Sequence, residues 1–181
     1  MTNTFRNLLL AACLTLTSAV ASAQVCLVSK GKPQARIVLA TDNATNRTAA
    51  QLLQRFVRET SGAQLPIVAN DNRRAKNQVV IGDTTTLATA DGYAIDCSHG
   101  TLAIKTAGGK GAIYGVATLL EKCLGVDYLA SHYYTLTPSA NINIPAMHVA
   151  ESPAFRFRQT FSYSNNDPTY RDWMRLQEHR E

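Results

Sequence analysis

Hydrophobic residues recur every three or four positions in two parts of the chain, which is typical of amphipathic helices. The first part gathers five apolar side chains on one face: Ala49, Leu52, Leu53, Phe56 and Val57. This helix is expected to begin near Thr45 or Asn46, because both residues can cap a helix start, and to end at Gly62. The second helix is expected between the glycine-rich residues 108–111 and Gly125.

Short apolar runs bounded by polar or turn residues predict a set of strands. The runs lie at residues 36–40, 65–68, 78–81, 93–97, 101–105, 126–130, 133–136 and 142–144. Ser98-His99-Gly100 separates two of these runs, which indicates a hairpin. Together the pattern predicts an α/β (α+β) sandwich, in which a mixed β-sheet packs against two main helices.

The first 23 residues have the pattern of a cleavable signal peptide. One cation, Arg6, precedes an apolar run, and Ala21-Ser22-Ala23 supplies the small side chains found before a cleavage site. The run is too short and too rich in Thr, Ser and Ala for a spanning helix. Too little apolar sequence precedes Cys13 for a lipid anchor at that residue. We therefore expect an exported protein, periplasmic, at the cell surface or extracellular, without a membrane span.

Composition and charge add few constraints. The 181 residues carry a formal charge of +5, which becomes +4 when the segment with Arg6 is removed. The basic residues are scattered rather than gathered with aromatics, so nucleic-acid binding is not favoured. Cys26, Cys97 and Cys123 remain after signal cleavage, and export permits one disulfide among them, with three possible pairings.

No motif for metal, cofactor or nucleophilic chemistry occurs in the sequence. His-Glu-x-x-His and Cys-x-x-Cys spacings are absent, so neither a metal nor a cofactor is expected. Residues 108–111, Gly-Gly-Lys-Gly, precede a helix and could attract an anion there. They match neither the dinucleotide nor the P-loop spacing, and a tight connection is the favoured interpretation. Glycoside hydrolysis needs two carboxylates across a cleft, and no acidic pair stands out.

The character of the chain changes after Pro145. Residues 151–153 have the composition of a linker, residues 155–161 alternate aromatic with basic or polar side chains as a strand does, and residues 167–181 predict a polar helix. One strand and one helix with little apolar face cannot bury a core of their own. The expected division is a signal peptide at 1–23, an N-terminal domain at 24–150, and a linker with the start of an incomplete second domain at 151–181.

Two stretches resemble the N-terminal domain of α-glucuronidases and family 20 β-hexosaminidases. Residues 49–68, AAQLLQRFVRETSGAQLPIV, resemble its first helix and second strand. Residues 111–130, GAIYGVATLLEKCLGVDYLA, resemble its second helix and the strand beyond. In such proteins this non-catalytic domain precedes a (β/α)8 barrel that holds the catalytic acid and base. The resemblance therefore implies that the chain ends in the incomplete start of a barrel.

The end of the chain resembles two kinds of relative. Residues 153–158, Pro-Ala-Phe-Arg-Phe-Arg, resemble the hexosaminidase segment that opens the barrel, where an arginine binds sugar hydroxyls. The resemblance implies that Arg158 binds substrate, a role that suits the fixed donors of a guanidinium. Gln159 stands where those hexosaminidases carry glycine. Residues 167–176 look more like large secreted bacterial proteins of unknown function, which carry this domain ahead of a barrel-like region.

The function implied by the resemblance is an accessory domain of an exported carbohydrate-active protein. That protein would be a glycoside hydrolase acting on complex polysaccharide, with polysaccharide and its own downstream barrel as partners, and this chain alone would be inactive. The alternative is a stand-alone glycan-binding or scaffold module. It would hold a glycan through Tyr133, Tyr134, Trp173 and arginines, since aromatic rings can stack on sugars.

Overall fold

The computed structural model describes residues 24–69 and 76–177. The predicted signal peptide, residues 1–23, lies outside the described residues, as do residues 178–181 of the predicted C-terminal helix. Within the described ranges, no helix combines the length and the apolar character that crossing a bilayer requires.

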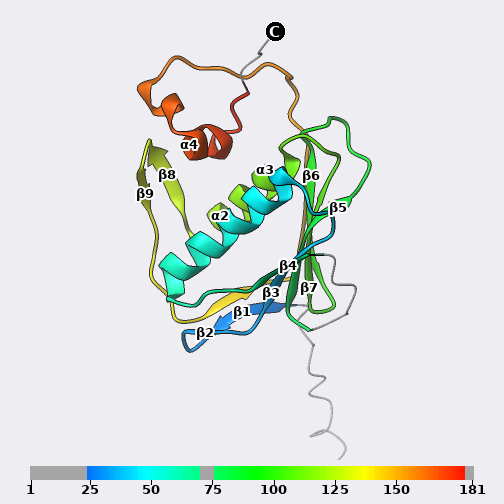
Figure 1. Cartoon of the computed structure of the whole chain (residues 1–181), viewed down its shortest axis with the longest axis vertical. Helices are drawn as coiled ribbons and strands as arrows, with labels where there is room; N and C mark the ends of the chain where they lie inside the picture. Colours follow the sequence, from blue (N-terminus) through cyan, green and yellow to red (C-terminus); the bar gives the residue numbers. More distant parts are fainter. Residues whose placement is uncertain (1–23, 70–75, 178–181) are drawn as a thin grey trace, which may run out of the picture.

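A six-stranded mixed sheet forms the centre of the fold (Figure 1). Its strands lie in the order β11 (Met147–Glu151), β6 (Tyr93–Ser98), β7 (Thr101–Thr106), β5 (Gln78–Thr84), β3 (Arg36–Leu39) and β4 (Ile67–Ala69). Strand β3 is parallel to β4 and β5, and β5 is parallel to β7. Strands β6 and β11 are antiparallel to their neighbours, so the predicted hairpin is confirmed as β6–β7.

Two smaller antiparallel sheets flank the central one. Strands β10 (Ile142–Ile144), β1 (Val25–Ser29) and β2 (Lys32–Pro33) form the first, and β8 (Asp127–Ala130) with β9 (Tyr133–Thr135) forms the second. The sequence pattern did not predict β1, β2 or β11. The expected mixed α/β architecture is confirmed in coarse form, with several sheets and three α-helices in the described residues.

Helix α2 (Ala44–Ser61) begins earlier than the sequence suggested. The side chain of Asn43 accepts a hydrogen bond from the backbone N–H of Asn46 at 2.8 Å and so caps the helix. Asn46 is not the cap, because its own side chain donates to the carbonyl of Thr41. The predicted stop is confirmed: Gly62 has a φ of 76°, and its N–H donates to the Arg58 carbonyl.

Helix α3 (Gly111–Leu119) packs beside α2 and against β6 and β7 of the central sheet (Figure 1), and all of its residues are buried. Gly115 permits this close approach, because a Cβ there would lie 2.6 Å from Cγ2 of Ile104. The helix continues as the π-helical turn η1 (Leu120–Leu124) and ends at Gly125, as predicted.

Residues 151–177, the C-terminal segment, pack on the sheets and helices described above, which form the α/β unit. The contact is made through the short helix α4 (Pro168–Trp173), which follows a 3-10 turn, η2 (Tyr163–Asn166). The strand predicted at residues 155–161 is wrong. No strand lies beside this stretch, whose only ladder contact in the described structure is an isolated bridge between Arg158 and Gln177. Helix α4 is shorter than predicted, because the chain turns at Arg175, which has a φ of 55°. The domain division at residue 150 stays a prediction.

Candidate functional site

Arg158, the predicted substrate-binding residue, lies where residues 151–177, the C-terminal segment, meet the turn before β6. Its side chain is 17% exposed and pairs with that of Asp91, which is 12% exposed, at a distance of 2.9 Å from Nη2 to Oδ2. The other oxygen, Oδ1, accepts the backbone N–H of Lys110 at 3.1 Å. Asp91 therefore joins the start of α3 to the C-terminal segment.

The carboxylate of Asp91 lies at the start of α3, where it accepts the backbone N–H of the N-cap residue Lys110. The first N–H groups of a helix are unsatisfied within the helix and carry a partial positive charge. Because Asp91 accepts the N–H of Lys110, the protein supplies its own anion there. This contact gives residues 108–111 a structural role and agrees with their interpretation as a tight connection.

The remaining donors of the Arg158 guanidinium also contact the protein. Nε donates to the carbonyl of Arg175 at 2.7 Å, and Nη1 donates to the carbonyl of Phe155. Nη2 additionally lies 3.2 Å from Oε1 of Gln177 and 3.4 Å from the Tyr114 hydroxyl. Burial alone would lower the pKa of Arg158, but the hydrogen bonds to Asp91 and Tyr114 outweigh it and raise the pKa. The substrate-binding role of Arg158 stays a prediction.

Gly109 provides a test of the Asp91 contact. It has a φ of 50°, and a Cβ at this position would lie 2.2 Å from Oδ1 of Asp91. We expect Gly109→Ala to lower the free energy of unfolding by about 1–3 kcal/mol, from backbone strain and displacement of the carboxylate. Urea denaturation measures this. Gly100→Ala is the matched control, since Gly100 has a φ of 76° and open space around it. Equal losses in the two variants would contradict the role of Asp91.

A second series of hydrogen bonds connects the C-terminal segment to α3 and to the central sheet. Nη2 of Arg175 donates to the hydroxyl of Thr118 at 2.6 Å, and that hydroxyl lies 2.6 Å from the hydroxyl of Tyr93. Tyr93 in turn donates to the carboxylate of Glu151. Burial, followed by the bond to Glu151, raises the pKa of Tyr93 to about 12, so this hydroxyl keeps its proton at neutral pH. These contacts fasten Arg175 to the sheet and to α3.

A third cluster centres on the buried carboxylate of Asp167, which caps α4. Oδ1 accepts the N–H of Thr169 at 2.8 Å. Oδ2 accepts the hydroxyl of Tyr128 at 2.9 Å and the backbone N–H of His132 at 3.0 Å. Burial alone would raise the pKa of Asp167, but these hydrogen bonds outweigh it and lower the pKa below its usual value. The cluster joins α4 to the β8–β9 hairpin.

The lowered pKa of Asp167 predicts a pH-dependent contribution to stability. A carboxylate with a depressed folded-state pKa stabilises the protein above its unfolded pKa of about 3.9, and this contribution is lost as the pH falls through the folded value. We expect Asp167→Asn to lower the free energy of unfolding at pH 7 by about 1–2 kcal/mol. The difference from the unmodified chain should shrink below about pH 4. Urea denaturation from pH 7 to 3 measures it, and a difference independent of pH would contradict the prediction.

The three aromatic residues proposed for glycan stacking have different surroundings. Trp173 is buried in the core, with its ring 5.4 Å from that of Phe56. Tyr134 is partly buried and hydrogen bonds through its hydroxyl to Arg55 at 2.9 Å. Tyr133 is exposed. The described structure therefore does not unite them in one exposed platform.

The cysteines and other metal-binding side chains form no evident centre. No disulfide joins Cys26, Cys97 and Cys123. Burial raises the pKa of the Cys97 and Cys123 thiols, which disfavours their reactive thiolate form. Across residues 24–69 and 76–177, no group of three or more His, Cys, Asp or Glu side chains is placed to hold a metal ion.

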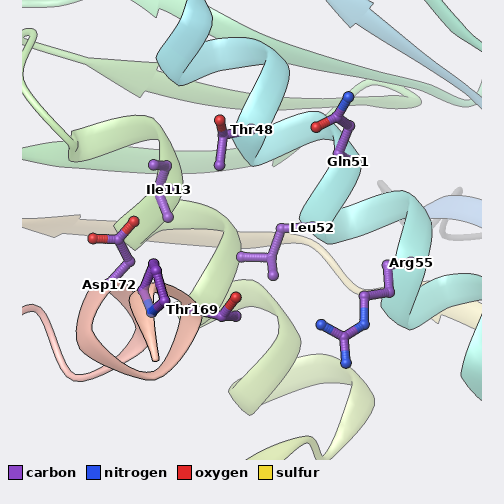
Figure 2. Close-up of a pocket in the computed structure, with 8 residues that line it drawn as sticks. Thr48, Gln51, Leu52, Arg55, Ile113, Thr169 and Asp172 are labelled. Atoms are coloured by element: carbon purple, nitrogen blue, oxygen red, sulfur yellow. The ribbon is translucent and has the colours of Figure 1, made fainter. Parts of the chain in front are cut away.

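Among the described residues, three hollows border the C-terminal segment. One of about 230 Å³, the α2–α4 hollow, lies where α2, α3 and α4 meet (Figure 2). Its lining residues are Thr48, Gln51, Leu52, Arg55, Ile113, Pro168, Thr169 and Asp172. A second hollow, of about 600 Å³, includes Glu151, Phe155 and Arg175. A third, of about 450 Å³, includes Asp91, Phe155 and Arg156. Arg158 lines the second and third hollows.

Sequence reasoning missed Asp91, Tyr93 and Asp167 as members of these clusters. Asp91 lies in a polar turn and Tyr93 begins a strand, so neither position differs from many surface or core positions in a single sequence. The role of Asp167 as a helix cap could have been predicted, because an aspartate directly before a proline, here Pro168, is typical of a helix start.

Comparison with known proteins identifies the fold. A family model described as "Glycosyl hydrolase family 20, domain 2" matches residues 29–158. The GH20 β-N-acetylhexosaminidase from Streptomyces coelicolor A3(2) is 16% identical with a TM-score of 0.55, and the match covers 76% of this chain and 25% of that one. An inactive mutant of the GH20 exo-β-N-acetylglucosaminidase from Vibrio harveyi is 13% identical, with a TM-score of 0.50 and coverage of 75% and 18%.

A family GH115 4-O-methyl-α-glucuronidase is also similar, at 16% identity and a TM-score of 0.50, with 74% of this chain and 19% of that chain covered. The predicted resemblance to both enzyme families is therefore confirmed at the level of the domain. No curated protein sequence matches the chain. The chain spans between 18% and 25% of the length of these three structures.

Proposed function

Because the chain belongs to the family of glycosyl hydrolase family 20, domain 2, we propose that it is a non-catalytic accessory domain of an exported glycoside hydrolase acting on complex polysaccharide. The family match over residues 29–158 is the observation that carries this proposal. Such a domain is a module of carbohydrate-active proteins. The similar solved structures include enzymes of two glycoside hydrolase families, which supports the choice of a glycoside hydrolase as the parent.

The carboxylates around the hollows support a non-catalytic role. Glycoside hydrolases generally act through two carboxyl groups, about 5–10 Å apart, on either side of the scissile bond. Each of the three hollows is lined by one carboxylate, and each carboxylate contacts a partner inside the protein. The pairs are Asp172 with Lys110, Glu151 with Tyr93, and Asp91 with Arg158.

The aromatic segment, residues 155–163, is the surface that meets the downstream barrel in this proposal. Phe155, Phe157, Phe161 and Tyr163 are all exposed, and Phe161 is fully exposed. Exposed aromatic side chains close together in the sequence support an interaction surface, because soluble proteins rarely leave large apolar patches uncovered. Arg158 lies within this segment, and Nη1 donates one of its two hydrogens to Phe155. In this proposal, the second hydrogen of Nη1 is the donor that would bind a sugar hydroxyl where this domain meets the barrel.

Two assays test the proposal. The purified chain should not hydrolyse aryl glycosides or aryl glucuronides, and hydrolysis that follows this polypeptide through purification would refute the non-catalytic role. Expression of the full sequence in a bacterial host should give a mature chain that begins at Gln24 outside the cytoplasm. An uncleaved cytoplasmic product would refute export.

A further inference from the structure

The α2–α4 hollow combines an apolar floor with polar walls. Leu52 of α2 and Ile113 of α3 provide apolar side chains at the base, and Figure 2 shows side chains from three helices converging on the same space. One face of α2 lines the hollow with four residues spaced at helical intervals: Thr48, Gln51, Leu52 and Arg55. Helix α4 supplies the opposite wall through Thr169 and Asp172.

The charges at the hollow are already balanced within the protein. Nε of Arg55 donates to Oε1 of Glu59 at 2.9 Å, and Nζ of Lys110 donates to Oδ1 of Asp172. A charged ligand would therefore have to compete with these ion pairs. These two ion pairs favour a neutral ligand, because a neutral ligand can form hydrogen bonds with the lining side chains without separating either pair.

Two neutral polar groups in the walls have unused hydrogen-bonding capacity. The side-chain amide of Gln51 and the hydroxyl of Thr169 make no hydrogen bond within the described part of the chain. An amide offers two donors and an acceptor, and a hydroxyl offers a donor and two acceptors. Both residues line the hollow together with the apolar Leu52 and Ile113.

From this arrangement we infer that the α2–α4 hollow binds a single neutral pyranose unit of a polysaccharide. A pyranose presents C–H groups, which match the apolar floor, and hydroxyls, which match Gln51 and Thr169. The volume of about 230 Å³ is below the range of about 300–1,000 Å³ typical of pockets for larger ligands, so one sugar ring suits it. The inference rests on the proposed function for its choice of a carbohydrate ligand.

Nuclear magnetic resonance titration of the full chain tests this site. The probes are methyl β-D-glucopyranoside, methyl β-D-galactopyranoside and methyl β-D-xylopyranoside, with sodium glucuronate as the charged comparison. At least one neutral glycoside should give saturable amide shifts on α2 and α4. Gln51→Ala and Thr169→Val should each raise its Kd about 2- to 10-fold, as loss of one neutral hydrogen bond predicts.

Matched substitutions outside the hollow are the controls. Gln64→Ala and Thr86→Val change the same residue types at exposed positions and should leave the Kd unchanged. The inference fails if no neutral glycoside gives saturable shifts, if glucuronate binds more tightly than every neutral probe, or if the hollow variants and controls behave alike. Each of these results leaves the proposed accessory function standing, because that function is tested by hydrolysis and not by this titration.

Discussion

Replacing Trp173 with alanine is expected to lower the free energy of unfolding by about 3–5 kcal/mol, the usual cost of removing a large aromatic side chain from a core. Trp173 is 2% exposed, and its ring lies 5.4 Å from that of Phe56 and 5.5 Å from that of Tyr128. The substitution leaves a cavity that joins α2, β8 and α4. Urea denaturation followed by circular dichroism measures the loss.

Phe161→Ala is the control for Trp173→Ala. It removes another aromatic ring from the C-terminal segment, but Phe161 is fully exposed, so the expected change is within about 0.5 kcal/mol. If residues 151–177 unfolded independently of the rest, Trp173→Ala would leave the main transition of the chain in place. A single transition that shifts by the full amount would show that this segment and the α/β unit unfold together.

The elements predicted well from sequence are those whose pattern is local. Helix α2 has its buried face at Ala49, Leu53, Phe56 and Val57, because hydrophobic spacing along a helix is visible without its partners. Strands β6 and β7 were found because a turn at Gly100 separates two alternating runs. Strand β11 was missed because Met147–Glu151 is a short edge strand, and all five of its residues are only partly buried or exposed.

Contacts between distant parts of the chain limited the prediction of the site. Residues 167–177 have little hydrophobic periodicity, and the burial of Trp173 depends on the aromatic residues Phe56 and Tyr128, which come much earlier in the chain. Likewise, nothing local marks Asp91 as the anion at the start of α3. The family resemblance named Arg158, but the ion pair that holds its guanidinium depends on where the loop before β6 lies.

The C-terminal segment is held by contacts of different chemistry at several points. Trp173 contributes apolar burial, and Asp167 caps α4 while accepting the Tyr128 hydroxyl. Arg175 contacts Thr118, and Asp172 contacts Lys110. All three hollows include residues of this segment, so their shape depends on its docking. Ligand binding at any of them is therefore expected to stabilise the docked segment.

Arg158→Ala is expected to lower the free energy of unfolding by about 2–4 kcal/mol, because it leaves the largely buried carboxylate of Asp91 without its cation. Asp91→Asn should remove part of the same interaction, so the double variant should lose less than the sum, with a coupling of about 1–3 kcal/mol. Urea denaturation of the four proteins measures this. Arg156→Ala is the control, since Arg156 is exposed, and its expected change is within about 0.5 kcal/mol. Equal effects of the two arginine substitutions would mean that Arg158 does not fasten the segment, and would favour a guanidinium available to bind sugar.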